Sequence, residues 1–261
     1  MDDRGIKLLP EEQSPALSII IPTFNEARSI NQTLDAVMSV RGRVEVIVVD
    51  GGSFDGTVEI VRGRSTTLVT SERGRGAQMH AGACAARGRA LWFLHADTHA
   101  TPDSSEHILE ALRDPKVVAG NFQLRFDGKR RAARFLTWLY PQLRKLGLCY
   151  GDSAIFVRRE AYEQVGGFQP FPIFEDLDLV RRLRKCGRVA HLPSFVTTSS
   201  RRFEGRSFTL TFARWAFLQA LYWLGVHPRT LGWLYAPVRG AGRKVRYDDG
   251  SSEACGQVRS G

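Results

Sequence analysis

The feature that most constrains the fold is an alternation, through the first hundred residues, of short apolar runs with stretches of helical spacing. The apolar runs are 17–21, 44–50, 66–71 and 90–97. Between them, apolar residues recur at helical spacing over 30–40, and small residues fill 76–88. Near-continuous apolar strands separated by helices are typical of a parallel sheet covered by helices on both faces. We therefore expect an α/β fold with a Rossmann-like, mainly parallel sheet.

The second half is less regular, but its elements can still be placed. Segments 117–126 and 189–200 have the composition of strands, the latter of a strand pair. Segments 130–147 and 174–187 predict helices, and 151–168 runs from a strand into a helix. The sequence thus predicts a flexible tail at 1–15, one domain at 16–205, a helical segment at 206–244 and a flexible tail at 245–261.

The most apolar segment, 208–228, is long enough to suggest a membrane-spanning helix. Arg214 and Gln219 interrupt it, and Gly225 and Pro228 close it. We expect instead an amphipathic helix, which packs on the domain, on a second copy in a homodimer, or on a membrane surface. The sequence leaves these three open.

The net charge is +10 and the isoelectric point is near 9.9, which suits an anionic partner such as nucleic acid, a nucleotide or an acidic membrane. The 4 cysteines form no C-x-x-C pair, so free thiols in a reducing compartment are expected. The first residues lack the basic-then-apolar pattern of a signal peptide. We expect a cytoplasmic protein, with peripheral contact to the inner face of the membrane left open.

Polar residues end three of the predicted strands. They form the segments 23–26 (TFNE), 50–53 (DGGS) and 95–97 (HAD). Parallel α/β sheets bind ligands beyond the carboxyl ends of their strands. The sequence therefore predicts a ligand site that these three segments share.

Five motifs in order carry a resemblance to a known family. They are PTFNE (22–26), DGGSFDGT (50–57), HAD (95–97), GDSAIFVRREAYEQVGGF (151–168) and FEDLDLVRRLRKCGRV (174–189). Together they resemble the family 2 glycosyltransferases, which have the GT-A fold, and the resemblance covers about residues 17–195. It implies an inverting enzyme that moves a sugar from a UDP- or GDP-sugar to an acceptor hydroxyl, with Mg²⁺ or Mn²⁺. A narrower resemblance is to a bacterial subgroup tied to radical-SAM and arsenosugar pathways.

The resemblance implies a set of nucleotide contacts at the strand ends. These are Pro22, Thr23, Asn25, Glu26, Asp50, Arg75, His95 and Ala96. In the family, the counterpart of Asp50 accepts a hydrogen bond from a uracil-type base; the alternative is an Asp that accepts amide hydrogens in its own turn. Glu26 has the alternative role of capping the next helix. Arg75, beside a helix N-terminus, suits a pyrophosphate, with a solvated arginine as its alternative.

The metal site implied by the resemblance centres on Asp97. The usual first Asp of the family's DxD motif is His95 here, which could be a metal ligand, a group that supports the ligands from behind, or a nucleotide contact. His191 is a second candidate ligand, although a lone histidine in a strand is more often structural. Mg²⁺ prefers oxygen ligands, whereas Mn²⁺ accepts imidazole more readily.

Two further groups are expected near the sugar, the acceptor or the diphosphate. Asp152 is one, with helix or strand capping as its alternative role. Arg201 and Arg202 are the other, with a basic surface loop as the alternative. The unknown acceptor itself is not named by any motif.

The catalytic prediction is the Glu175-Asp176 pair at the start of a predicted helix. The resemblance assigns Asp176 as the general base that takes the acceptor's proton. The alternative is that both acids, with Asp178, only complement the positive end of the helix dipole.

Two other function classes fit the sequence less well. A nucleotidyltransferase would have a Gly-rich loop with Arg or Lys after the first strand, where this chain has PTFNE. A non-catalytic basic protein that binds nucleic acid or membrane would gain nothing from Asp50, Asp97, Glu175 and Asp176. We therefore expect a nucleotide-sugar partner and no nucleic acid.

Overall fold

The computed structural model describes residues 14–128, 131–145, 154–199 and 208–235. The predicted tails, apart from residues 14 and 15, lie outside these ranges. The described chain forms one eight-stranded sheet with the strand order β3-β2-β1-β4-β7-β6-β8-β5.

The first half of the sheet is parallel and follows the predicted alternation. Its strands are β1 (Leu17–Thr23), β2 (Val44–Asp50), β3 (Thr67–Thr70) and β4 (Ala90–Phe93). The helices between them are α1 (Ile30–Met38), α2 (Thr57–Arg62) and α3 (Arg75–Ala85). The register places Thr23 beside Asp50, so β1 and β2 end level with each other. The first four predicted strands are thereby confirmed, although β4 stops before His95.

The second half mixes directions. Its strands are β5 (Thr98–His99), β6 (Val117–Phe126), β7 (Phe156–Arg158) and β8 (Arg188–Thr198). Its helices are α4 (Ser104–Ala111), α5 (Arg131–Lys145), α6 (Arg159–Gln164) and α7 (Glu175–Leu183). Strand β7 runs antiparallel between β4 and β6, and β6 pairs in parallel with β8.

The predicted strand pair at 189–200 is one strand, β8. Its register against β6 shifts between Asn121 and Gln123, opposite the stretch that contains Pro193. Proline cannot donate to a strand ladder, so it bends β8 without ending it. The sequence pattern gave no signal for α4 or for the short β5.

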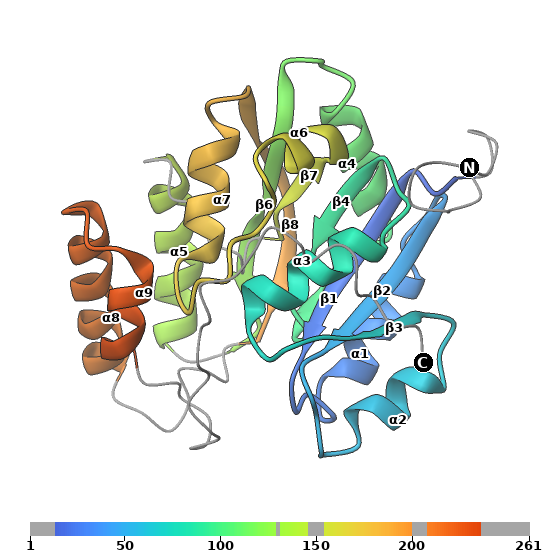
Figure 1. Cartoon of the computed structure of the whole chain (residues 1–261), viewed down its shortest axis with the longest axis horizontal. Coiled ribbons are helices and arrows are strands. Elements are labelled where there is room, and N and C mark those ends of the chain that lie inside the picture. The colour runs from blue at the N-terminus through green and yellow to red at the C-terminus, as the bar shows by residue number, and fades with distance from the viewer. Residues whose placement is uncertain (1–13, 129–130, 146–153, 200–207, 236–261) are drawn as a thin grey trace.

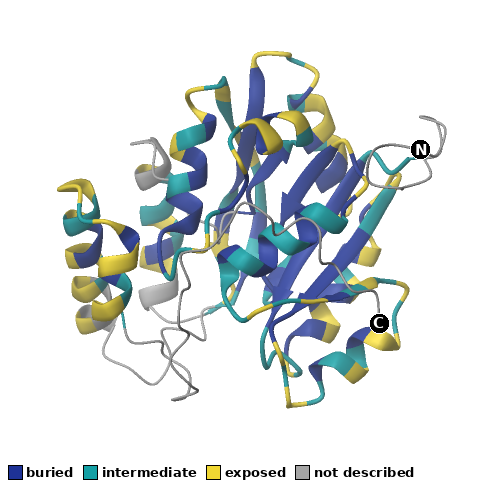
Figure 2. Ribbon diagram, in the orientation of Figure 1, coloured by how far each residue is buried: buried dark blue, intermediate teal, exposed yellow. Residues whose placement is uncertain are grey.

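Helices cover both faces of the sheet, as predicted. One apolar layer joins the strands to Ile30 and Leu34 of α1 and to Ile108 of α4. The other joins them to Met79 of α3 and Leu179 of α7. Figure 2 shows the strands as the buried layer between these helices. The mainly parallel, helix-covered sheet predicted from the sequence is confirmed.

The C-terminal segment forms two helices, α8 (Phe208–Trp223) and α9 (Pro228–Leu234). They are separated by Gly225, whose φ of 89° is in the left-handed region. The Val226 amide donates to the Leu221 carbonyl and the Gly225 amide donates to the Tyr222 carbonyl, a Schellman ending. Leu218 and Leu231 pack against Ile173 and Phe174 before α7.

The outward side of α8 differs from the amphipathic prediction. Leu210, Phe217 and Trp223 are exposed there, so apolar side chains occupy the solvent side as well as the packed side. No helix within the described ranges is long and apolar enough to cross a membrane.

Candidate active site

The ends of β1 and β2 form one hydrogen-bonded unit. The buried Asp50 carboxylate accepts from the Thr23 hydroxyl (3.2 Å) and the Ser53 hydroxyl (2.5 Å) at Oδ1, and from the amides of Gly52 (2.9 Å) and Ser53 (2.8 Å) at Oδ2. A carboxylate offers about four lone-pair sites, and these four donors match them. Asp50 therefore shapes its own turn, the alternative considered above. A contact to a base stays a prediction, and it requires one of these bonds to be exchanged.

Gln78 of α3 is a supporting residue that the sequence analysis did not identify. Its buried Nε2 donates to the backbone carbonyls of Thr23 (2.7 Å) and Val49 (2.8 Å). A Cβ at Gly51 would lie 3.1 Å from the Gln78 amide, so this turn has little room for a side chain. The signal for Gln78 was weak, because a polar residue in a small-residue helix has many roles.

The loops after β1 and β2 are interlocked. Asn25, with a φ of 55°, accepts from the Phe54 amide (3.0 Å) and donates its own amide to Ser53 Oγ (2.9 Å). Asp55 accepts from the Ala27 amide (3.1 Å) and from the Thr57 hydroxyl (2.5 Å). Burial opposes ionisation of Asp55, but these hydrogen bonds outweigh it and hold the pKa of that carboxyl below its ordinary value. The two loops form a fixed frame.

Glu26 and Pro22, two further predicted nucleotide contacts, have local structural roles. Pro22 is buried inside β1. Glu26 Oε2 accepts from the Ser29 hydroxyl at 2.8 Å at the entry to α1, which is a side-chain bond and not a cap on a helix amide. Its role toward a nucleotide stays a prediction.

An aromatic pair lies on this frame. Phe24 and Phe54 meet edge to face, with ring centroids 6.1 Å apart, and Phe54 is 83% exposed. The Arg73 guanidinium lies over the Phe24 ring, 3.9 Å from its centroid. Phe24 and Phe54 lie within the TFNE and DGGSFDGT motifs, but their contact with Arg73 could not be read from the sequence, because exposure does not follow from residue type.

The HAD segment forms a turn directly after β4. The Thr98 amide donates to the His95 carbonyl (3.0 Å), and the Thr33 hydroxyl donates to the Ala96 carbonyl (2.8 Å). His95 and Ala96 are buried, whereas Asp97 is partly exposed. The Ser199 amide donates to the Asp97 carbonyl (3.1 Å), so this turn is tied to the end of β8. Asp97 thus lies just beyond the carboxyl end of β4, as predicted.

His191 does not join Asp97. It lies near the start of β8, where Nδ1 is 2.8 Å from Asn121 Oδ1. Seven residues of strand, roughly 20 Å at a rise of about 3.3 Å each, separate His191 from Thr198, which pairs with Thr98. Within the described ranges, no group of three or more His, Cys, Asp and Glu side chains could hold a metal ion. The structure gives His191 a structural partner and does not bring it to the HAD turn.

A divalent ion can still fit at Asp97. Mg²⁺ commonly takes one or two carboxylates from a protein and completes its shell with substrate phosphates and water. A partly exposed carboxylate on a turn at the ligand edge of the sheet matches that donor set.

The N-termini of α3 and α7 meet at the same edge. Arg75 Nε lies 2.9 Å from Glu175 Oε1, and the Glu175 side chain is only 3% exposed. Asp176 is also buried, and its Oδ1 accepts from the Leu177 amide at 2.7 Å. Two helix N-termini bring positive dipole ends together here. The structure therefore joins Arg75 and Glu175, predicted for different roles, in one ion pair.

The C-terminal helices reach this region through Tyr222 of α8. Its ring packs on Phe174, with centroids 5.0 Å apart. Burial and the charge of Asp178 raise the pKa of Tyr222 above its ordinary value, against the effect of its hydrogen bond with Arg181. The acidic turn of α7 is thus covered from outside by α8.

Three predicted residues, Asp152, Arg201 and Arg202, lie outside the described residues. Their proposed contacts with the sugar, acceptor or diphosphate stay predictions.

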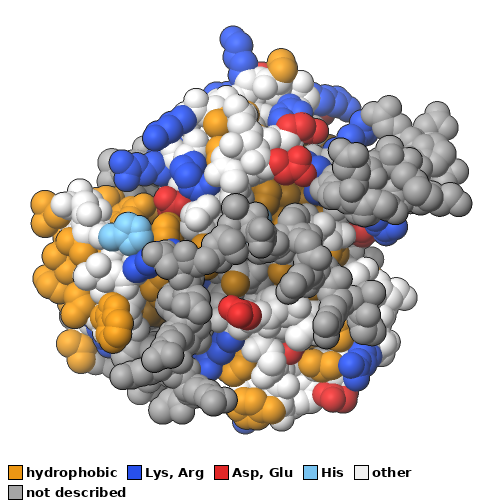
Figure 3. Space-filling model, viewed as in Figure 1, with side chains coloured by type: hydrophobic (Ala, Val, Ile, Leu, Met, Phe, Trp, Pro, Cys, Tyr) orange, Lys and Arg blue, Asp and Glu red, His pale blue; other side chains and the backbone are white. Residues whose placement is uncertain are grey.

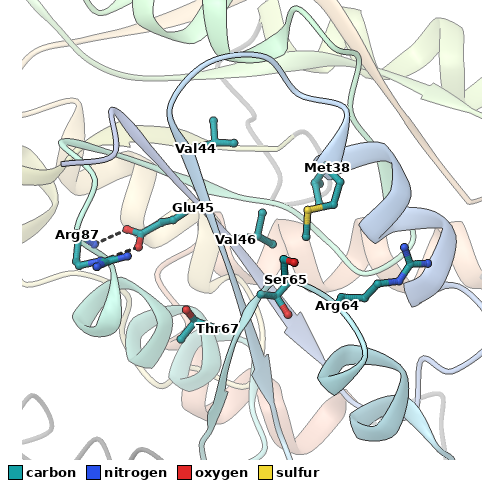
Figure 4. Close-up of a pocket in the computed structure, with 10 residues that line it drawn as sticks. Met38, Val44, Glu45, Val46, Arg64, Ser65, Thr67 and Arg87 are labelled. Carbon is teal, nitrogen blue, oxygen red and sulfur yellow. Dashed lines mark hydrogen bonds and ion pairs between the residues drawn. The ribbon is translucent and has the colours of Figure 1, made fainter. Parts of the chain in front are cut away.

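A hollow of about 460 Å³ lies elsewhere (Figure 4), lined in part by Glu45, Arg64, Thr67 and Arg87. It is at the amino ends of β2 and β3, the edge opposite Thr23 and Asp50. Glu45 is held there by the Arg87 side chain and amide. The hollow is therefore separate from the strand-end site.

The family model of glycosyl transferase family 2 matches residues 18–165. The chain belongs to glycosyl transferase family 2. The matched range contains β1 to α6, and so includes the strand-end frame and the HAD turn.

Relatives of this family-2 chain include the glycosyltransferase AglE of Haloferax volcanii, 31% identical over 175 residues, or 60% of this chain and 56% of the relative. The chain thus spans about half the length of that curated relative. A mannosyltransferase from Pyrobaculum calidifontis, solved with GDP-mannose and Mn²⁺, is 25% identical with a TM-score of 0.62, covering 79% of this chain and 62% of that one.

A glucosyl-3-phosphoglycerate synthase from Mycobacterium tuberculosis, solved with Mn²⁺ and UDP, has a TM-score of 0.56 at 19% identity, covering 82% of this chain and 81% of that one. At that identity it supports the fold alone. The GT-A prediction for this family-2 chain is confirmed.

Proposed function

We propose that the protein is a glycosyltransferase that moves a sugar from a UDP- or GDP-sugar to an acceptor hydroxyl, with inversion and with a divalent metal. The observation that carries this proposal is the convergence, at one edge of the sheet, of the Asp50 frame, the Asp97 turn and the joined N-termini of α3 and α7. The mannosyltransferase solved with GDP-mannose and Mn²⁺ supports a nucleotide-sugar donor and a divalent metal.

The proposed chemistry is a single displacement. Asp176 accepts the proton of the acceptor hydroxyl while the acceptor oxygen bonds to the anomeric carbon from the face opposite the diphosphate. The bond from that carbon to the diphosphate oxygen breaks, and the nucleoside diphosphate leaves with the electron pair. Glu175 pairs with Arg75 at the N-terminus of α3, and in this proposal the Arg75 guanidinium meets the diphosphate.

Asp97 is the residue that would hold the metal, with His95 beside it in the same turn. When bound there, a divalent cation would neutralise the charge that develops on the departing diphosphate. The frame built by Asn25, Asp50 and Asp55 would hold the nucleoside without rearranging.

Thermal unfolding with UDP, GDP and a panel of their sugars, with and without Mn²⁺, tests this proposal. A ligand at about 100 times its Kd stabilises the folded state by about 2.7 kcal/mol. We expect stabilisation by one nucleotide class, increased by Mn²⁺. Asp97→Asn should remove the Mn²⁺ increment, whereas Asp103→Asn, at the partly exposed residue before α4, should keep it. No stabilisation by any nucleotide would refute the proposed function.

Three finer predictions remain open beside this proposal. They are membership of the radical-SAM and arsenosugar subgroup, a cytoplasmic location, and the absence of a nucleic-acid partner. Identification of the accepted donor and acceptor would bear on the first of these.

A further inference from the structure

The helices α5, α8 and α9 form one end of the molecule with an unusual surface. Six large apolar side chains on these helices and directly after α8 are each at least 60% exposed, and we call this set the apolar end: Trp138, Leu210, Phe217, Trp223, Leu224 and Trp233. Among the other described residues, only one large apolar side chain, Phe54, is as exposed. In Figure 3 the hydrophobic side chains gather at the left, over α8 and α9. Large exposed apolar side chains gathered on one part of a molecule mark an interaction surface.

The charge pattern of the same part of the chain points to the partner. Two stretches, 128–151 and 205–247, contain 13 of the 37 Lys and Arg residues and none of the 27 acidic residues. The rest of the chain has 24 basic and 27 acidic residues, so the whole positive excess comes from these stretches. Both contain the helices of the apolar end. The partner must therefore be anionic and also accept apolar side chains.

We propose that the apolar end binds the surface of an anionic lipid membrane. The membrane interface favours tryptophan, and four of the five tryptophans lie in these two stretches. A negative leaflet attracts arginine, while the boundary of the acyl chains accepts leucine and phenylalanine. Exposed Arg134 of α5 and Arg229 of α9 lie on the same helices.

Other partners fit less well. A second copy would bring the same arginine-rich, acid-free stretches together, and like charges across an interface oppose association. Nucleic acid would reward the arginines but would leave Leu210, Phe217 and Leu224 in water. A lipid surface satisfies both features at once.

The proposed surface is one helix layer away from the active-site candidates. Leu218 and Leu231 pack on Phe174 and Leu177, on either side of Glu175-Asp176. Docking would therefore hold the acceptor side of the enzyme close to the bilayer. This consequence rests on the proposed function, whereas membrane binding itself does not.

Vesicle flotation of the full chain tests the proposal. Wild type should float with vesicles of equimolar phosphatidylglycerol and phosphatidylcholine and not with phosphatidylcholine alone. Trp223→Ala, Leu224→Ala and Trp233→Ala should each weaken binding about tenfold, because each removes a large side chain from the lipid boundary. Arg134→Gln and Arg229→Gln should each weaken it about fivefold.

Matched controls on the opposite part of the molecule separate these effects from general ones. Met38→Ala and Leu109→Ala remove partly exposed apolar side chains from α1 and α4, and Arg113→Gln removes an exposed arginine from the end of α4. All three should bind vesicles as wild type does. Thermal unfolding confirms that each variant is folded. If the other variants do not fold, Trp233→Ala alone tests the proposal.

Three results would overturn the proposal. One is no binding to phosphatidylglycerol vesicles while nucleotide binding is intact, which leaves the proposed function standing. Another is a dimer in solution that Trp223→Ala dissociates without any effect on vesicles. The last is tight binding to duplex DNA or RNA that depends on the arginines but not on the tryptophans.

Discussion

The carboxyl edge of the sheet and the apolar end differ in how far their side chains are already paired within the protein. At the sheet edge, the polar groups of Asn25, Asp50, Asp55 and Gln78 are bonded to the backbone of neighbouring loops. At the apolar end, large side chains such as Trp233, which is 85% exposed, have solvent on most of their surface.

This difference indicates how each region would meet a partner. A site whose loops are already cross-linked needs no ordering when a ligand arrives, which favours accurate placement of the reacting groups. An exposed apolar face gains free energy only when something covers it. The difference agrees with the two proposals, chemistry at the edge and attachment at the apolar end.

The largest effect is expected from Asp176→Asn, which tests whether the edge is organised for chemistry. The amide keeps the shape and removes the basicity, so turnover should fall by roughly 10²- to 10⁴-fold with donor affinity little changed. Release of the nucleoside diphosphate in the presence of an established acceptor measures it.

Asp178→Asn is the matched control for this variant. Asp178 lies on the same turn but pairs with Arg182 at 2.7 Å, so its removal should change turnover far less. Near-normal turnover in Asp176→Asn would move the search for the base to Glu175 or Asp152.

The second prediction compares two residues of α9. Leu231 is fully buried against α7, whereas Trp233 is exposed. Leu231→Ala should lower the free energy of unfolding by about 2–5 kcal/mol, because it leaves a cavity. Trp233→Ala should change it by less than about 0.5 kcal/mol. Urea unfolding of both variants measures this, and an equal loss would mean that Trp233 is covered in solution.

The sheet half of the fold could be predicted closely from the sequence. Val44–Asp50 was expected and observed with the same bounds, because a continuous apolar run between turn residues leaves few alternatives. The predicted strand at 90–97 was too long, because the observed strand ends at Phe93. His95 and Ala96 are buried in the turn that follows, and buried residues can look like part of a strand in the sequence. Burial, not strand pairing, explains that apolar pattern.

The sequence indicated which residues lie at the strand ends, but it did not indicate which residues they contact. Position at a strand end could be read from the sequence, which is why Asp97 and the Glu175-Asp176 pair are found at one edge. The partners could not be read: Arg75 meets Glu175 across a hundred residues of chain. His191 was placed by analogy, and its distance from Asp97 follows from the register of β8, which the sequence does not encode locally.

The third prediction uses Asp50→Asn to sharpen the role of the frame. An amide nitrogen replaces an acceptor that receives two hydrogen bonds, so one or two donors lose their partner. The free energy of unfolding should fall by about 1–3 kcal/mol in the absence of any nucleotide. Asp35→Asn, on the exposed side of α1, is the control. Loss of nucleotide affinity with unchanged stability would instead make Asp50 a direct contact.

The smallest effect concerns acid, which should act on the sheet through His80 and not on the arginines of the apolar end. Burial lowers the pKa of His80 of α3 below its ordinary value of 6.5. Its Nδ1 is 3.1 Å from the Tyr162 hydroxyl, and its Nε2 is 3.8 Å from Cys84 Sγ. As the pH falls below about 6.5, the His80 imidazole therefore takes up a proton in the unfolded chain before it does so in the folded chain. The free energy of unfolding falls as a result.

The loss attributable to His80 cannot exceed about 1.4 kcal/mol per pH unit, the limit for one proton. His80→Gln should flatten the fall of the unfolding free energy between about pH 7 and about pH 5, measured by urea unfolding. His107→Gln, which removes a more exposed histidine on α4, is the matched control. Arg134 and Arg229 stay protonated in this range, so the part of vesicle binding that depends on these two arginines should not follow the same curve. An unchanged slope in His80→Gln would show that the acid sensitivity of the sheet half comes from its carboxylates instead.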